Sequence, residues 1–419
     1  MIIITRRQAI GTMAAGAALA VGFAPSVFAA TTAAAGSIDE ALAEAVKSGR
    51  IPGVVALAAN DKGPIYSGAF GVRSLAQSQP MTVDSVFWIA SMTKAVTTTA
   101  AMQMVEEGKL KLDLPASEIL PELASAQVLE GFDAAGSPQL RPAKRPITLR
   151  QLLTHTAGYT YDIWNENTGR YEKYANLPGI ITCKDDALKT PLAFDPGDRW
   201  EYGINIDYAG KMVEKVSGQR LESYFHDRIF GPLGMTDTSF KLSPSQRERL
   251  VAMHARGDDG SLKPIEFEMP QEPEFFMGGG GLYSTGPDYL KFVRMFLNHG
   301  SLDGKTVLRP ETVATMAQNQ IGDLRVVMLK TVAPGSSTDA EFFPGMVKKW
   351  GLGFMINTET APTGRTAGSL AWAGLGNTYF WIDPTRNVAG VILMQLLPFG
   401  DPRALQAFSE FESRVYKTA

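Results

Sequence analysis

The sequence predicts an α/β (α+β) fold, in which an antiparallel sheet is flanked by helices and carries an inserted, mostly helical domain. Strand-like segments gather near both ends of the chain, whereas helical patterns and long loops occupy its middle. The C-terminal strand-like segments are joined by very short links, which require antiparallel neighbours. With 419 residues, 45% of them hydrophobic, the chain is long enough to bury a large core.

The predicted elements follow from hydrophobic periodicity and from turn and cap signals. The expected strands cover residues 52–59, 64–71, 351–356, 369–373, 378–382 and 388–395. The expected helices cover residues 38–46, 95–105, 148–153, 207–217, 220–229, 286–297 and 402–416. Thr148 to Gln151 is a capping-box pattern, and residues 31–36 read as a linker. Strands are hard to find between about residues 110 and 275.

Three regions follow from this order of elements. Residues 37–110 and 285–417 are expected to form the sheet domain, and residues 111–284 the mostly helical inserted domain. The first 29 residues are expected to be a twin-arginine-type signal peptide, because Arg6 and Arg7 precede a short, weakly apolar run and a small-residue site. That signal predicts a bacterial periplasmic or secreted protein with no stable membrane span after its removal.

Composition excludes several classes of function. The net charge is −3 and no basic runs occur, so nucleic acid is not an expected partner. The four histidines and Cys183 lie far apart in the sequence, with no spacing that suits zinc or iron–sulfur binding. We therefore expect no metal, no cofactor and no internal disulfide.

The stretch that carries chemistry is Ser91-Met92-Thr93-Lys94. An apolar strand-like run leads into Ser91, and an apolar helical run follows Lys94, so Ser91 lies at or near a helix N-terminus. Lys94 is one turn further along on the same face, where an amine can help to deprotonate the serine. This is the Ser-Lys form of nucleophilic catalysis. The alternative is that Ser91 caps the helix and Lys94 is solvated.

The general base is less evident. No Gly-x-Ser-x-Gly motif is present, and His155, the best placed histidine, ends a short helix, where a structural role is common. Tyr202 is the candidate, since it follows a Pro-Gly turn and precedes a helix; the alternative is a core tyrosine. The glycine run at 278–281 lacks the Lys-Ser/Thr of a phosphate loop and instead predicts a close backbone approach.

Four motifs occur in a specific order: Ser91-x-x-Lys94, the Leu152–Gly158 run, Pro196-Gly197-x-x-Trp200-x-Tyr202, and Gly279–Thr285. Together they resemble the serine β-lactamase/penicillin-binding-protein superfamily in its class C branch, and most closely the family VIII carboxylesterases. The resemblance covers nearly the whole mature chain. It implies that Ser91 is the acylated nucleophile and that Lys94 and Tyr202 form the base network.

Two departures from the class C pattern concern substrate binding. Ile204 stands where that pattern has the Asn of Tyr-x-Asn, and Trp372-Ala373-Gly374 stands where it has Lys-Thr-Gly. Trp-x-Gly is similar to family VIII esterases, and the resemblance implies an oxyanion hole from the N–H groups of Ser91 and Leu375. Tyr174-Ala175-Asn176 fits Tyr-x-Asn literally but lacks the Pro-Gly-x-x-Trp lead-in, so Tyr202 is favoured over Tyr174.

The expected function is a serine carboxylesterase that cleaves short-chain acyl esters through an acyl-enzyme. The alternatives are a class C-type β-lactamase or D-amino-acid peptidase, an acyltransferase with the same mechanism, and a silent penicillin-binding protein. The expected partner is a small-molecule ester; the natural substrate and the oligomeric state stay open. Esters should be preferred over β-lactams because Trp372 offers no positive charge to a β-lactam carboxylate, unless another cation such as Arg365 supplies it.

Overall fold

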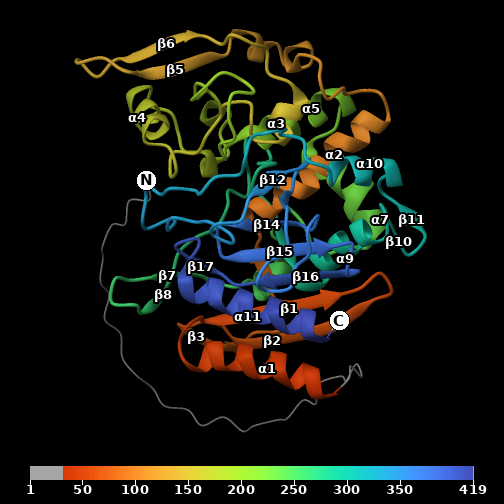
Figure 1. The fold of residues 1–419 in the computed structure, drawn as a ribbon. Coiled ribbons are helices and arrows are strands. Elements are labelled where there is room, and N and C mark those ends of the chain that lie inside the picture. Colours follow the sequence, from red (N-terminus) through yellow and green to blue (C-terminus); the bar gives the residue numbers. More distant parts are fainter. Residues whose placement is uncertain (1–31, 419) are drawn as a thin grey trace.

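The structure, a computed structural model, describes residues 32–418. Its centre is an eight-stranded sheet in the order β12-β13-β14-β15-β16-β1-β2-β3, and every neighbouring pair is antiparallel (Figure 1). The strands of this sheet are β1 (Gly53–Ala59), β2 (Pro64–Ser74), β3 (Gln77–Pro80), β12 (Lys348–Trp350), β13 (Met355–Asn357), β14 (Leu370–Gly374), β15 (Thr378–Asp383) and β16 (Val388–Leu393). The predicted antiparallel sheet, built from both ends of the chain and flanked by helices, is confirmed.

Helices cover both faces of this sheet, which is why its central strands are buried throughout. Successive side chains of a strand point to opposite faces. In β15, Phe380 packs against Tyr289 of α9 (Gly286–Leu297), with ring centroids 5.3 Å apart. Tyr379 stacks instead on Phe408 of α11 (Pro402–Thr418) at 4.6 Å. α1 (Thr32–Lys47) packs beside α11, so α9 lies on one face and α1 with α11 on the other.

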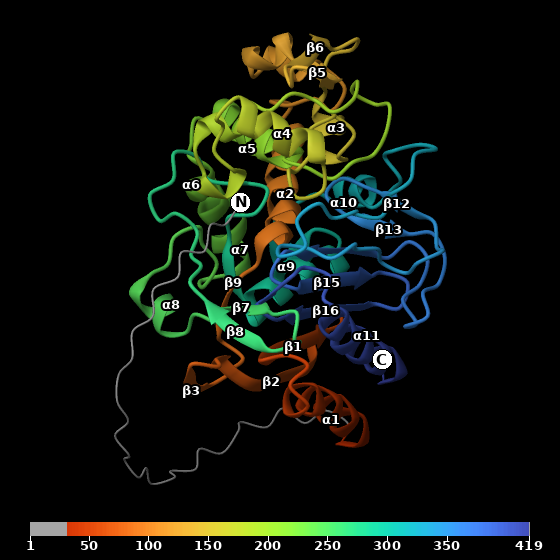
Figure 2. The ribbon, with the colours of Figure 1, turned by 90° about the vertical axis from the view of Figure 1, so that its left-hand side faces the viewer.

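The segment from β5 (Gln127–Phe132) to α5 (Asn205–Ser217) lies at the top of Figure 2, whereas β7 (Met253–Arg256) and β8 (Leu262–Ile265) lie beside the sheet, at the lower left. The long helix α2 (Thr93–Glu106) runs into the upper part and packs against α5. The other helices are α3 (Leu149–Leu153), α4 (Glu166–Tyr174), α6 (Leu221–Phe225), α7 (Gly231–Leu233), α8 (Pro244–Glu248) and α10 (Pro310–Met316). The remaining strands are β4 (Val86–Trp88), β5 (Gln127–Phe132), β6 (Pro138–Pro142), β7 (Met253–Arg256), β8 (Leu262–Ile265), β9 (Tyr283–Thr285), β10 (Ser301–Leu302), β11 (Lys305–Thr306) and β17 (Leu396–Leu397).

Several local predictions are met. The capping box at Thr148 and Gln151 is present at the start of α3. Thr285 caps α9 by accepting a hydrogen bond from the Asp288 backbone N–H. These features rest on contacts between residues close in sequence, which a sequence pattern can indicate.

Other predictions were wrong in detail. The structure places the hairpins β5–β6 and β7–β8 in the region where strands were hard to find. β5–β6 carries Pro138, Pro142 and an irregular register at Gly131, and it is largely solvent-accessible, so it shows no regular apolar alternation. α1 begins at Thr32 rather than after a linker, which suits the helix propensity of its alanines. The predicted domain boundaries remain predictions, and the predicted signal peptide lies outside the described residues.

Candidate active site

Ser91 lies in a tight 3-10 turn, Ala90–Met92, between β4 and α2. Ala90, the residue before it, has φ +44°, a left-handed conformation that is rare and strained for a residue with a Cβ. The turn is fixed from outside, because the Ile89 N–H donates to the Leu282 carbonyl at 3.0 Å. Ser91 itself is half-buried.

The glycine run holds the first turns of α2 in place. Thr97 Oγ1 donates to the Gly278 carbonyl at 2.6 Å, and the Leu282 N–H donates to Thr93 Oγ1 at 3.1 Å. A Cβ at Gly279 would collide with the Asp207 carboxylate. The close backbone approach predicted for this run is therefore present, and it sets the backbone of Gly279 beside Lys94.

Lys94 is fully buried and touches three oxygen atoms. Its Nζ lies 3.1 Å from Ser91 Oγ, 2.9 Å from the Tyr161 hydroxyl and 2.6 Å from the Gly279 carbonyl oxygen. Burial lowers the pKa of Lys94 to about 7. A neutral amine in this position can donate two hydrogen bonds, to Tyr161 and Gly279, and still accept the hydroxyl proton of Ser91.

Asp207 is the carboxylate that balances this buried amine. Its Oδ1 accepts a 2.7 Å hydrogen bond from the Gly279 N–H, so Gly279 contacts both charged groups through its two backbone polar atoms. Its Oδ2 has no partner among the described residues. Burial raises the pKa of Asp207 to about 6, whereas the Lys94 charge acts to lower it; Asp207 in turn acts to raise the pKa of Lys94.

Tyr202 is also fully buried, and Lys94 Nζ lies 4.6 Å from the centroid of its ring. Its hydroxyl accepts a hydrogen bond from the Trp372 indole Nε1–H at 3.0 Å. Burial raises the pKa of Tyr202, and its hydrogen bonds with Ser91 and Trp372 act against that rise. The structure therefore brings Ser91, Lys94, Tyr202 and Trp372 together, with the phenol protonated at neutral pH.

The backbone predicted to bind an oxyanion lies beside the serine turn. A Cβ at Gly374 would collide with the Ile89 carbonyl oxygen, so the end of β14 approaches the turn more closely than any other residue type allows. Thr378 Oγ1 also donates to the Ile89 carbonyl, at 3.4 Å. Leu375 directly follows Gly374 and is half-buried, which sets its backbone within the same neighbourhood as Ser91.

Four further residues singled out in the sequence lie outside the group formed by Ser91, Lys94, Tyr202 and Trp372. His155 is buried, and burial lowers its pKa well below the usual range. Its Nδ1 lies 3.2 Å from Asn205 Nδ2 and accepts a 3.4 Å hydrogen bond from the Gly203 N–H, so it supports the segment that carries Tyr202. Ile204 is buried directly before α5. Tyr174 is 59% exposed at the end of α4. Arg365 is buried, and its Nε donates to Glu412 at 2.6 Å.

Sequence reasoning missed Tyr161 and Asp207. Tyr161 lies three residues beyond the Leu152–Gly158 run, in a segment without regular secondary structure, and only its contact with Lys94 singles it out. Asp207 was missed because an acid in the first turn of a helix is common there: it interacts favourably with the helix dipole. One feature of the sequence could have indicated it: Asp207 stands between apolar residues of a helix expected to be buried, where a charged side chain needs a partner.

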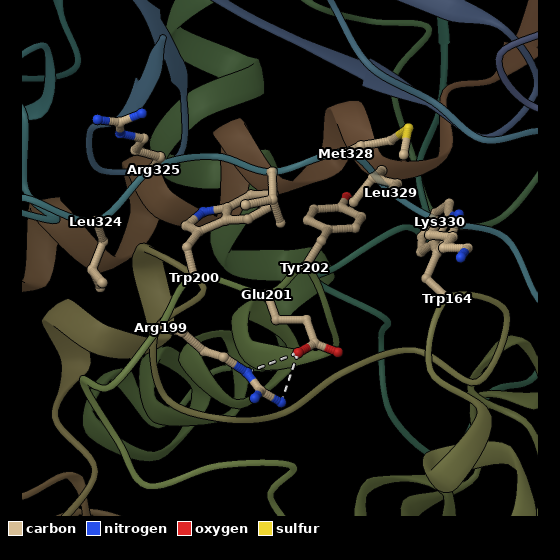
Figure 3. A pocket seen from close by; sticks show the side chains of 11 residues that line it. Trp164, Arg199, Trp200, Glu201, Tyr202, Leu324, Arg325, Met328, Leu329 and Lys330 are labelled. Carbon is tan, nitrogen blue, oxygen red and sulfur yellow. Dashed lines mark hydrogen bonds and ion pairs between the residues drawn. The ribbon is translucent and has the colours of Figure 1, made fainter.

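A pocket of about 360 Å³ opens beside Tyr202. Trp164, Trp200 and Tyr202 line it from one side, and the Leu324–Lys330 segment lines it from the other (Figure 3). Ser91 is not among the residues that line this pocket, whereas Tyr202, its hydrogen-bond partner, is. Among residues 32–418, no cluster of His, Cys, Asp and Glu could hold a metal ion, and no helix is both long and apolar enough to cross a membrane.

Comparisons with known proteins identify the family of this chain. Residues 38–412 match the family described as Beta-lactamase. The chain is 33% identical over 399 residues to monacolin J acid methylbutanoyltransferase from Aspergillus terreus, covering 90% of this chain and 95% of that protein. It is 35% identical over 406 residues to lovastatin esterase from Penicillium rubens, covering 91% and 98%. A solved structure of a simvastatin synthase mutant from Aspergillus terreus superposes with a TM-score of 0.79 at 32% identity, covering 91% and 96%.

Proposed function

Because the chain belongs to the Beta-lactamase family, we propose that it is a serine enzyme that cleaves carboxylic esters through an acyl-enzyme on Ser91. One observation carries this proposal: a fully buried lysine amine lies 3.1 Å from the serine hydroxyl, at a strained turn before a helix. Burying a lysine costs folding free energy, so a buried lysine is a candidate functional residue. Burial lowers the pKa of Lys94 to about 7.

In the first step, Ser91 Oγ attacks the ester carbonyl carbon while Lys94 accepts its proton. Lys94 suits this role because a large share of it is neutral at neutral pH. The oxygen that becomes negative in the tetrahedral intermediate would bind the backbone N–H groups of Ser91 and Leu375. Tyr202 is protonated at rest, so it does not begin the cycle as a phenolate.

In the second step, the intermediate expels the alkoxide, which takes a proton from Tyr202. The Trp372 indole N–H, 3.0 Å from the phenol oxygen, stabilises the negative charge that then develops on Tyr202. The proton that Lys94 took from Ser91 then passes to the Tyr202 phenolate beside it, which restores the neutral amine and the phenol. Water attacks the acyl-enzyme by the reverse of these transfers and releases the acid.

Acyl transfer to an alcohol is the second candidate, and the relatives favour it. One relative of this chain is named as a methylbutanoyltransferase and another as an esterase, at similar identity. Both outcomes share the acyl-enzyme and differ in whether water or an alcohol attacks it. We propose ester cleavage as the basal activity and transfer to an alcohol as a competing fate of the same intermediate.

The proposal also predicts a preference for esters over β-lactams. Trp372 offers an indole N–H to Tyr202 and carries no positive charge for a β-lactam carboxylate. Arg365 cannot replace that charge while it is buried against Glu412. Trp372→Lys should therefore lower kcat/KM on a short p-nitrophenyl ester and raise it on a chromogenic cephalosporin. No gain on the cephalosporin would contradict the electrostatic explanation.

The test of the function uses a p-nitrophenyl butyrate assay, a phosphonate label and an alcohol acceptor. Wild type should release p-nitrophenol, take up the phosphonate at Ser91 and form more butyrate ester as alcohol is added. Ser91→Ala should lose all three. A phosphonate adduct mapped by mass spectrometry to another serine would overturn the assignment of the nucleophile, and turnover that survives Ser91→Ala would overturn the acyl-enzyme.

A further inference from the structure

His155 binds the peptide groups on both sides of Tyr202. Its carbonyl oxygen accepts a hydrogen bond from the Glu201 N–H at 3.0 Å, and its Nδ1 accepts one from the Gly203 N–H at 3.4 Å. The same Nδ1 lies 3.2 Å from Nδ2 of Asn205. Because the residue before Tyr202 and the residue after it bind to the same distant residue, His155 fixes the backbone from which the phenol projects.

The imidazole of His155 can make these contacts in one tautomer only. The Gly203 N–H is a donor, and so is the Asn205 amide nitrogen, which also donates to the Tyr159 carbonyl at 2.9 Å. Nδ1 must therefore carry the lone pair, and Nε2 the proton. Nε2 is buried and has no hydrogen-bond partner within residues 32–418. Since an apolar side chain would avoid the cost of that unpartnered N–H, the acceptor at Nδ1 is what this histidine supplies.

The backbone of His155 is in an uncommon conformation. Its φ is +58°, in the left-handed region that asparagine and glycine enter more readily than most residues. In this conformation the buried ring lies against the Tyr202 ring, with centroids 4.6 Å apart, and edge to face with Trp350 at 5.1 Å. Trp350 in turn packs against Trp372, which donates its indole N–H to the phenol. An uncommon backbone conformation beside a reacting group calls for a functional explanation.

We propose that His155 is a positioning residue for Tyr202: its Nδ1 keeps the phenol in hydrogen-bond contact with Ser91, where it can protonate the departing alkoxide. The inference rests on the proposed function for the fate of that proton. In the transfer, the O–H bond of the phenol breaks and the O–H bond of the alcohol forms. The phenolate that remains faces the indole N–H of Trp372.

Loss of the Nδ1 acceptor affects Tyr202 and spares the nucleophile. The Gly203 N–H would lose its partner, so the segment that carries the phenol shifts to find another. Ser91 and Lys94 lie at the start of α2, which the glycine run at 278–281 holds in place without His155. Removing the acceptor should thus impair protonation of the leaving group more than attack by the serine.

The leaving group of the ester distinguishes a positioning role from a merely structural one. Ethyl butyrate expels a strongly basic alkoxide that needs the Tyr202 proton, whereas p-nitrophenyl butyrate expels a weakly basic phenolate that does not. His155→Leu should lower kcat/KM, which reports acylation, by about 10- to 100-fold on the ethyl ester and far less on the p-nitrophenyl ester. His155→Asn has nearly the same size and shape as His155→Leu, tolerates the positive φ and offers an amide oxygen near Nδ1, so it should retain most of the activity. Equal losses on both esters, or equal losses in both variants, would overturn the proposal.

A double-mutant cycle tests whether His155 acts through Tyr202. In a Tyr202→Phe background there is no phenol proton to position. His155→Leu should then cause no further loss of kcat/KM on ethyl butyrate. A loss as large as the one in the wild-type background would show that His155 acts through another group and would overturn the proposal.

NMR of isotope-labelled histidine and tryptophan nitrogens separates failure of this inference from failure of the proposed function, because it needs no turnover. In the wild-type protein at neutral pH, His155 should carry its proton on Nε2 and none on Nδ1; a proton on Nδ1 overturns the proposal even if esters are cleaved. The Trp372 indole N–H signal, assigned by its absence in Trp372→Phe, should move in His155→Leu and stay in His155→Asn. That result supports the positioning of Tyr202 even if no ester is cleaved, and an unmoved signal in His155→Leu overturns it. The wild-type tautomer decides the question even if His155→Leu does not fold.

Discussion

Replacing Trp372 with phenylalanine tests whether its indole N–H stabilises charge on Tyr202. The change removes the 3.0 Å hydrogen bond to the phenol oxygen and keeps an aromatic ring in the buried site. A hydrogen bond to a charged group contributes about 1.5–3 kcal/mol. If that charge develops only in the transition state, kcat should fall by about 10- to 150-fold. KM for a p-nitrophenyl ester should change little, because the ground-state phenol is neutral.

Trp350→Phe is the matched control. Trp350 is also buried, packs against Trp372 with ring centroids 4.6 Å apart, and donates its indole N–H at 3.2 Å to the Leu153 carbonyl. Both variants should lose a similar free energy of unfolding, about 1–3 kcal/mol, measured by urea denaturation. Only Trp372→Phe should lose kcat to the extent given above. Wild-type kcat in Trp372→Phe, or equal kcat losses in the two variants, would refute the reasoning.

Three other changes address the remaining groups of the site. Tyr202→Phe should lower kcat by about 10²–10⁴-fold, whereas Tyr174→Phe, at an exposed tyrosine, should leave it near wild type; the reverse result would show that the wrong tyrosine was chosen. Tyr161→Phe removes the hydroxyl 2.9 Å from Lys94 Nζ and should lower kcat/KM by about 10-fold in a steady-state assay, and an unchanged value would exclude a role for that contact. Asp207→Asn can still accept the Gly279 hydrogen bond but loses the charge that raises the pKa of Lys94. Since activity needs neutral Lys94, kcat/KM rises with pH through that pKa, and its midpoint should move to lower pH in the variant; a midpoint that moved upward would contradict the coupling.

Local sequence patterns were sufficient for part of this protein. Ser91 and Lys94 are three residues apart at the start of a helix, so their contact follows from helix geometry once the helix is predicted. The short links around β15 determined antiparallel pairing, which the register of β14, β15 and β16 bears out. The motif order determined the resemblance to the serine β-lactamase superfamily, which the family match confirms. The roles of Ser91, Lys94 and Tyr202 remain predictions, as do the domain boundaries and the export signal.

Contacts between distant segments were decided by the tertiary structure alone. The hydrogen bond from Trp372 to Tyr202 joins residues 170 positions apart, and that from Lys94 to Tyr161 joins residues 67 apart. The sequence could suggest that Trp372 replaces a lysine, but not that its indole N–H would reach the phenol. Asp207 lies in the first turn of α5, and only the packing places the Gly279 backbone between it and Lys94. Hydrophobic periodicity reports which face of an element is buried, whereas the partner that a buried polar atom finds depends on how elements pack.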